Sequence, residues 1–223
     1  HFVRNLTHST YVLRFDRNGL DFEPGQYISV GVKGGIDMRE YSIYSSPFDD
    51  YLEILVREVE DGYLSTRLRY LERGDELEVE GPFGFFTIDP YIRASGNLLF
   101  VATGSGISPF HSIVRTYPKL NYRLLHGVRT VRELYDHDTF CPDRVVSCIS
   151  REAVNPSLHR AVECTGDGGG FYEGRVTDYL QLRPPSADTH CYACGNCDMI
   201  YESFDILREH GVPPEQLFAE VYF

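Results

Sequence analysis

Residues 97–109 read Asn97-Leu98-Leu99-Phe100-Val101-Ala102-Thr103-Gly104-Ser105-Gly106-Ile107-Ser108-Pro109, an apolar run followed by a glycine-rich turn. A continuous apolar run is typical of a strand buried on both faces of a parallel sheet. Pro109 suits the first turn of a helix, where a missing backbone N–H costs nothing. Glycines let the backbone approach a pyrophosphate, and a helix N-terminus offers it N–H donors. The segment indicates a nucleotide-binding α/β domain, although an ordinary strand-to-helix turn can have this sequence.

The rest of the second half repeats the same alternation of strands and helices. Apolar runs at 122–126, 144–149 and 190–194 predict further buried strands, and 217–223 predicts a C-terminal strand. Asp198–His210 predicts a helix that ends at Gly211, with its apolar residues on one side. A parallel sheet covered by helices is therefore expected for this part.

The first half has a different period. Residues 9–15, 26–32 and 51–57 are short alternating segments separated by glycine-containing turns, which is typical of a small antiparallel barrel or sandwich. One helix is expected at about 64–71, because Leu64, Leu68 and Leu71 would share a face. We expect two domains, an antiparallel β-barrel over residues 1–93 and a parallel-sheet nucleotide-binding domain over residues 94–223.

Composition excludes several classes of protein. The 223 residues carry a net charge of −12, which argues against nucleic acid as a partner because phosphates need a basic footprint. No apolar run approaches the roughly 20 residues that cross a bilayer, so no membrane span is expected and a cytoplasmic location is favoured.

The six cysteines all lie in the second half, and Cys191, Cys194 and Cys197 stand at two-residue gaps. Such spacing resembles metal or iron–sulfur ligands. We expect no metal site, because side chains alternate faces along a strand and no fourth cysteine follows at cluster spacing. Free thiols in a reducing compartment are the simpler interpretation.

Several motifs occur together in one order. They are Arg39-Glu40-Tyr41-Ser42, Asp61-Gly62-Tyr63-Leu64-Ser65, Gly81-Pro82-Phe83-Gly84, the glycine turn, Cys194-Gly195-Asn196 and Glu220-Val221-Tyr222-Phe223. Together they resemble the ferredoxin–NADP reductase family over essentially the whole chain, and most of all its bacterial flavodoxin/ferredoxin type. In that family an FAD-binding barrel precedes an NADP-binding α/β domain, which agrees with the change of period.

The resemblance implies roles around FAD. Arg39 would pair with a phosphate of the cofactor, Tyr41 would lie against the flavin ring, and Ser42 would offer its hydroxyl to flavin N5. The remaining implied contacts are with the pyrophosphate, from Gly62, Leu64 and Ser65, and with the rings of FAD, where Tyr222 would stack on the flavin and Phe223 would cover the adenine. Taken singly, each of these residues has an ordinary structural explanation.

The resemblance also implies roles around the nicotinamide nucleotide. Cys194 would lie where nicotinamide docks, and Glu220 would support a proton or a hydrogen bond. Arg151 and Arg175 would surround the 2′-phosphate of NADPH, since cations there distinguish NADPH from NADH. The remaining NADP residues are those of the glycine turn: Thr103, Gly104 and Gly106. An insertion, Ala153–Tyr172, separates the two arginines.

The implied activity is hydride transfer between NADPH and FAD, with single electrons passed to or from a separate ferredoxin or flavodoxin. Two alternatives stay open: an NADH-dependent reductase component of an oxygenase or a free-flavin reductase, and a non-catalytic flavin-binding redox sensor. Because small electron carriers are usually acidic, a basic docking patch is expected despite the net charge. The candidates are Arg67, Arg69, Arg73, Arg115, Arg129 and Arg132.

Overall fold

The computed structural model describes residues 2–59, 62–154 and 169–222. The chain divides into two compact units, residues 1–87 with 108–118, and residues 88–107 with 119–223. We call them the antiparallel unit and the parallel unit. The predicted domain boundary after residue 93 stays a prediction, because these units are defined by packing and the first of them takes in a segment from beyond that boundary.

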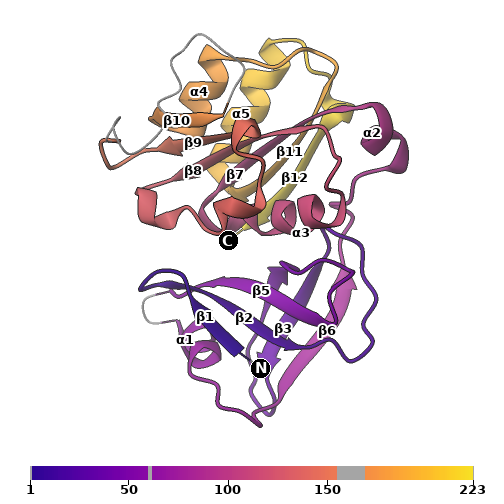
Figure 1. Ribbon diagram of the computed structural model, residues 1–223, viewed down its shortest axis with the longest axis vertical. Helices are drawn as coiled ribbons and strands as arrows, with labels where there is room; N and C mark the ends of the chain where they lie inside the picture. The colour runs from indigo at the N-terminus through magenta and orange to yellow at the C-terminus, as the bar shows by residue number, and fades with distance from the viewer. Residues whose placement is uncertain (1, 60–61, 155–168, 223) are drawn as a thin grey trace. The chain divides into compact units, whose positions relative to one another are not determined.

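The antiparallel unit contains two three-stranded sheets, ordered β1-β2-β5 and β4-β3-β6 (Figure 1). Every pairing in them is antiparallel, as the alternating sequence predicts. Their strands are β1 (Phe2–Asn5), β2 (Thr10–Asp16), β3 (Tyr27–Val32), β4 (Met38–Ser42), β5 (Tyr51–Arg57) and β6 (Leu77–Phe83).

The two sheets of the antiparallel unit share a buried core. Tyr11 and Leu13 of β2, Ile28 of β3 and Ile54 of β5 are fully buried in the same cluster, so both sheets enclose it. The predicted helix is α1 (Tyr63–Arg69), which ends two residues before Leu71 and contributes Leu64 and Leu68 to this core.

Helix α3 (Ser108–Thr116) packs with the antiparallel unit, although it follows the glycine turn in sequence. The Ser112 hydroxyl donates to the carbonyl of Ser45 at 2.6 Å. His111 donates from Nδ1 to the carbonyl of Tyr44 at 2.8 Å, and its ring stacks on the Tyr44 ring at 3.6 Å. These buried contacts attach the helix to the segment between β4 and β5.

The parallel unit holds a six-stranded sheet ordered β10-β9-β8-β7-β11-β12, in which all neighbours are parallel. This confirms the architecture that the continuous apolar runs predict. The strands are β7 (Asn97–Thr103), β8 (Tyr122–Val128), β9 (Val145–Ile149), β10 (Gly170–Glu173), β11 (Thr189–Asn196) and β12 (Leu217–Tyr222). Sequence reasoning missed β10, which begins inside the segment interpreted as an insertion; residues 155–168 of that segment lie outside the described residues.

Within the described part of the parallel unit, the α-helices are α2 (Pro90–Ser95), α4 (Val176–Leu182) and α5 (Cys197–Glu209). The unit also contains the 3₁₀ turns η1 (Gly104–Ile107), η2 (Val131–Glu133), η3 (His137–Thr139), η4 (Pro142–Arg144) and η5 (Pro214–Gln216). Helix α5 matches the helix predicted for Asp198–His210 within one residue at each end. Its N-terminus is capped by the Asn196 side chain, which accepts from the Met199 amide at 3.1 Å.

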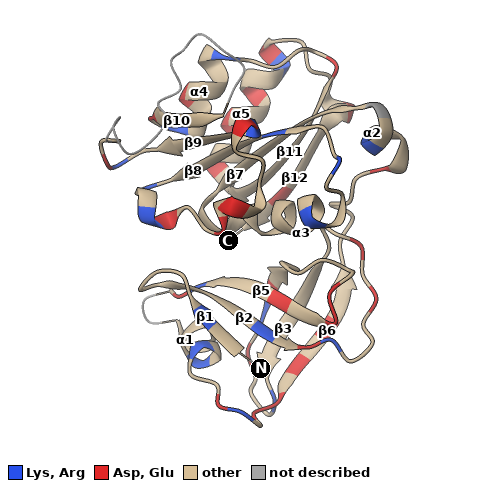
Figure 2. Ribbon diagram, viewed as in Figure 1, with Lys and Arg blue, Asp and Glu red and all other residues tan. Residues whose placement is uncertain are grey.

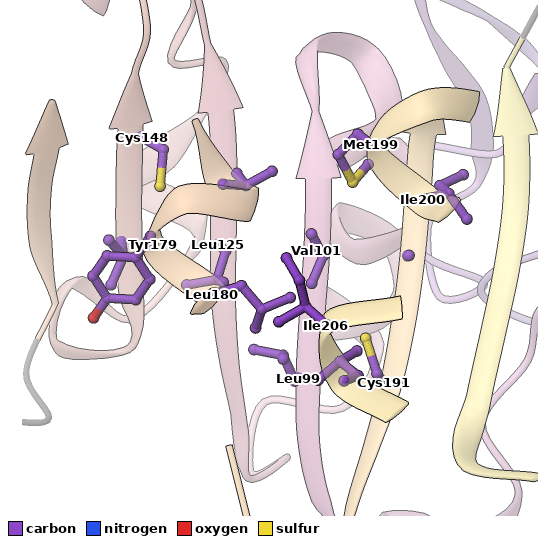
Figure 3. Close-up of a cluster of buried hydrophobic side chains, with 14 of the residues drawn as sticks. Leu99, Val101, Leu125, Cys148, Tyr179, Leu180, Cys191, Met199, Ile200 and Ile206 are labelled. Carbon is purple, nitrogen blue, oxygen red and sulfur yellow. The ribbon is translucent and has the colours of Figure 1, made fainter. Parts of the chain in front are cut away.

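Helices α4 and α5 lie on one face of the parallel sheet (Figure 1). Figure 3 shows the resulting core, where Tyr179 and Leu180 from α4 and Ile206 from α5 meet side chains of the strands. Cys148 and Cys191 are buried in this core, and burial raises the pKa of both thiols. They behave as small apolar side chains.

Among the residues that the structure describes, no helix is long and apolar enough to span a membrane. Acidic and basic residues are interspersed over the elements of each unit, so the net charge of −12 is not gathered on one element (Figure 2).

Candidate functional site

The strand order of the parallel unit singles out one place for a ligand. From β7 the chain continues through β8 and β9 to β10 on one side, and then returns to β11 and β12 on the other side. In such sheets, ligands bind at the carboxyl ends of the strands where the order reverses, here between β7 and β11. The glycine turn follows β7, and Cys194-Gly195-Asn196 ends β11. Both predicted motifs therefore meet at this position.

Two glycines allow the backbone of the glycine turn and the backbone at the end of β11 to approach each other closely. A Cβ atom added to Gly106 would lie 2.3 Å from the carbonyl oxygen of Cys194. Gly195 has φ +129°, and a Cβ atom on it would lie 2.4 Å from Thr103 Oγ1. The same Thr103 hydroxyl accepts from the Asn196 amide at 3.0 Å. The glycine turn and the end of β11 thus form one tightly joined backbone surface that a nucleotide can approach.

Cys194 is fully buried at the end of β11. Two other predicted site residues, Glu220 and Tyr222, lie on the neighbouring strand β12. The parallel register pairs Cys194 with Glu220 and Asn196 with Tyr222. Burial, and then the negative charge of Glu220, hold the pKa of the Cys194 thiol far above its usual value, and a hydrogen bond with Tyr222 opposes them. The thiol is therefore neutral at physiological pH, which suits steric positioning and not nucleophilic attack. Phe223 lies outside the described residues.

Arginines follow three neighbouring strands at the same edge of the sheet. Arg151 comes after β9, and its amide donates to the carbonyl of Arg129, which comes after β8, at 2.9 Å. Arg175 comes after β10, where the Gly174 amide donates to the carbonyl of Ile149 at the end of β9. All three arginines are exposed. Guanidinium groups suit phosphate oxygens, so this edge fits a phosphorylated ligand.

Arg129 was not predicted for this nucleotide role. The signal available in the sequence is its place directly after an apolar run, which Arg151 shares. Two carboxylates near these arginines accept hydrogen bonds from backbone amides. Glu133 accepts from the Arg129 amide at 2.8 Å, and Glu152 accepts from the Val131 amide at 2.9 Å.

The residues predicted to bind FAD lie in the antiparallel unit, beginning with β4. Arg39 is exposed. Its guanidinium has five N–H groups, and one nitrogen, Nη1, donates to the carbonyl of Met38 at 2.8 Å. Tyr41 is half-buried, and burial raises its pKa to about 12 against the opposing charge of Arg39. Ser42 is buried. A neutral aromatic ring beside an accessible cation fits a cofactor that has both rings and phosphates.

The other predicted FAD residues lie at the start of α1. Ser65 Oγ accepts from the Val59 amide at 3.1 Å, and the Tyr11 hydroxyl donates to the Ser65 carbonyl. Tyr41 packs against the core cluster that contains Tyr11 and Leu64, so the two predicted FAD segments are linked through one core. Leu64 is part of the core, and Gly62 caps the helix. Asp61, from the same motif, lies outside the described residues.

No group of three or more His, Cys, Asp or Glu side chains that could hold a metal ion occurs within the described ranges. Cys191 and Ala193 face the core shared with α4 and α5, so Cys194 faces the opposite side of β11. The thiols of Cys191 and Cys194 diverge, as the strand pattern predicts.

Comparison with known proteins agrees with this geometry. Residues 3–88 match the oxidoreductase FAD-binding domain family, and residues 100–203 match the oxidoreductase NAD-binding domain family. The solved structure of a ferredoxin NADP+ reductase from Neisseria gonorrhoeae with bound FAD and NADP superposes with a TM-score of 0.82 at 23% identity, covering 99% of this chain and 96% of that one. The fold and the matched domains define an FAD-dependent pyridine nucleotide oxidoreductase.

Relatives narrow this class. A ferredoxin–NADP reductase from Azotobacter vinelandii is 30% identical over 94% of this chain and 88% of its own length. The electron transfer component of toluate 1,2-dioxygenase from Pseudomonas putida is 27% identical over 99% of this chain, which spans 65% of that longer protein. The chain belongs to the ferredoxin–NADP reductase family.

Proposed function

We propose that this protein transfers a hydride between NADPH and FAD and exchanges single electrons with a separate ferredoxin or flavodoxin. FAD, when bound, supplies the conversion between two-electron and one-electron chemistry. The observation that carries the choice of NADPH is the set of exposed arginines after β8, β9 and β10. Family membership supports the choice of electron carrier.

Arg151 and Arg175 are proposed to bind the 2′-phosphate of NADPH, and the backbone bond between Arg151 and Arg129 supports Arg129 as a third cation there. NADH lacks this phosphate, so these cations would favour NADPH. The close approach of Gly106 to Cys194 supports binding of the nucleotide along the turn Thr103-Gly104-Ser105-Gly106.

Three residues are proposed to act near the reacting atoms. Ser42 is a hydrogen-bond donor toward flavin N5, and its burial favours one fixed hydroxyl position. Cys194 sets the position of nicotinamide with a neutral side chain. Glu220, paired with Cys194 in the β11–β12 register, is proposed to hold a proton or a hydrogen bond.

FAD itself is proposed to be held by residues of both motifs of the antiparallel unit. Arg39 binds a phosphate, Tyr41 lies against the flavin, and the backbone around Leu64 contacts the pyrophosphate. Gly62 and Ser65 complete that contact, and Tyr222 and Phe223 are proposed to cover the rings. Stacked aromatic rings exclude water from the flavin and must yield when nicotinamide enters.

Two of the arginines considered for docking the carrier already form ion pairs. Arg69 forms an ion pair with Glu58, and Arg115 pairs with Asp49 at 2.8 Å. Both positive charges are therefore partly neutralised within the antiparallel unit. Arg67, Arg73 and Arg132 are exposed and are the better candidates.

Anaerobic rapid mixing with NADPH and with NADH, followed at the flavin absorbance band, tests the proposal. We expect NADPH to bleach the flavin far faster, and a ferredoxin or flavodoxin to reoxidise it at a rate that falls with ionic strength. A protein that takes up no flavin when FAD is added would refute the assignment. A reoxidation rate that does not change with ionic strength would refute the basic docking patch.

An NADH-dependent reductase of an oxygenase, or a free-flavin reductase, is the second candidate. The similarity to the toluate 1,2-dioxygenase component supports it. Faster bleaching by NADH would favour this candidate, and stimulation by added free flavin would separate its two forms.

A further inference from the structure

Two histidines form a hydrogen-bonded chain that ends on the glycine turn. His126, on β8, is fully buried, and its Nδ1 lies 2.8 Å from Nε2 of His137 on η3. On the other side of the same ring, Nε2 of His126 lies 2.9 Å from the carbonyl oxygen of Gly104. Gly104 has φ +53° and begins η1 directly after β7. All of these residues belong to the parallel unit.

The chemistry of the three groups sets the direction of both hydrogen bonds. A carbonyl oxygen can only accept, so Nε2 of His126 carries a proton and donates to Gly104. A neutral imidazole has one N–H, so Nδ1 of His126 is an acceptor, and Nε2 of His137 donates to it. In the neutral pair, the Gly104 carbonyl therefore selects the Nε2–H form of His126, and this form in turn requires His137 to donate from its Nε2.

The surroundings favour this neutral pair. Burial lowers the pKa of His126 to about 4 and that of His137 to about 3, and the neighbouring ring adds to the second shift. The negative charge of Glu133 raises the pKa of His126, and that of Asp136 raises the pKa of His137. Neither effect outweighs burial. The other rings against the pair, Tyr135 beside His126 and Phe140 beside His137, are uncharged neighbours.

The bond to Gly104 orients more than one atom. The carbonyl of Gly104 and the amide N–H of Ser105 belong to one planar trans peptide and point in opposite directions. Holding the carbonyl toward His126 thus turns the Ser105 N–H to the other side of the turn. Glycine allows a wide range of backbone angles at position 104, so the bond from His126 adds to the constraint that the η1 turn places on this peptide plane.

We propose that His126 is a positioning residue for the nicotinamide nucleotide, which fixes the first peptide plane of the glycine turn, and that His137 holds the His126 ring in place by donating to its Nδ1. This inference rests on the proposed function, because it takes the glycine turn to be the nucleotide-binding loop. Neither histidine needs to touch the nucleotide; they act through the Gly104 carbonyl.

Substitutions at position 126 test the donor. His126→Gln keeps an N–H group at a similar reach, whereas His126→Leu removes it. We expect H126L to weaken NADP+ binding, measured by difference absorbance titration, and to raise the KM for NADPH about tenfold, with kcat changed less. H126Q should stay within about threefold of wild type, since it retains the hydrogen bond. FAD content and the flavin spectrum should not change in either variant.

A variant at position 137 keeps the test valid if H126L does not fold. His137→Leu leaves Nδ1 of His126 without a donor, so the buried ring loses one of the two hydrogen bonds that hold it in place. Two-bond ¹H–¹⁵N spectra of the rings report the tautomer directly. Wild type should show Nε2–H at His126 at pH 7, and H137L should bind NADP+ more weakly than wild type. His190→Leu, a half-buried histidine at the start of β11, is the matched control.

The outcomes separate the two proposals. If wild type binds NADP+ and H126L binds it equally well, the inference is wrong and the proposed function stands. An Nδ1–H form or a doubly protonated ring at His126 in wild type at pH 7 would also overturn the inference. If wild type binds neither NADP+ nor NAD+, the proposed function is wrong, and this inference is overturned with it.

Discussion

Gly106→Ala is a sharp test of how the glycine turn meets the end of β11. Gly106 does not have a positive φ, so alanine is allowed by the backbone and the cost is purely steric. The new Cβ would lie 2.3 Å from the Cys194 oxygen, 2.6 Å from the Cys194 carbonyl carbon and 2.8 Å from Gly195 Cα. All three neighbours are backbone atoms, which cannot rotate away as a side chain can.

A carbon–oxygen contact needs about 3.3 Å, so the turn and the strand must separate by about 1 Å. Overpacking of this kind costs about 1–3 kcal/mol, which for a protein of this size lowers Tm by about 2–12 °C. The separation would displace the turn from Cys194, so the KM for NADPH should rise while FAD stays bound.

Thermal unfolding and steady-state reduction with NADPH measure these effects. Ser105→Ala, in the same turn, removes an oxygen and adds no volume, and serves as the control for stability. A G106A protein with a Tm within about 1 °C of wild type and an unchanged KM would refute the reasoning.

Three further results are expected. Arg151→Ala and Arg175→Ala should each raise the KM for NADPH about tenfold with little effect on that for NADH, since each would remove one of the proposed charge-assisted phosphate contacts. Equal effects on both donors in steady-state assays would contradict the proposed role. The buried histidine pair keeps pKa values of about 4 and about 3 when folded. Its contribution to the free energy of unfolding is therefore complete above about pH 6.5 and is lost as the pH falls toward those values. Urea unfolding from pH 7 to pH 4.5 should show this loss, and the free energy of unfolding should depend less steeply on pH in H126Q. Iodoacetamide should label exposed Cys141 in the native protein and Cys194 only after unfolding, as peptide mass spectrometry would show; rapid native labelling of Cys194 would contradict its burial and raised pKa.

Several features followed from local sequence alone. Alternating segments in the first half and continuous apolar runs in the second half predicted antiparallel and parallel sheets, because the side-chain period reports which faces of a strand are buried. The apolar run into Gly104 likewise predicted a strand followed by a turn and a helix. These signals lie within about ten residues of one another, and short-range backbone preferences are enough to produce them.

The limits of that prediction appear at particular elements. Strand β10 is only four residues long and follows a glycine-rich segment, so its apolar signal is too short to recognise without its partner β9. Helix α3 follows the glycine turn in sequence but packs with the antiparallel unit through Ser112 and His111. Nothing local to the helix specifies which core its buried face joins.

The sequence by itself determined the order of the two architectures, the glycine turn and the residue types available for phosphate and flavin, because these depend on neighbours along the chain. Only the tertiary structure decided which of those residues meet: Arg129 with Arg151, Cys194 with Glu220, and His126 with the carbonyl of Gly104. Those pairs are set by strand order and register, which arise from packing between segments distant in sequence, and no local pattern encodes them.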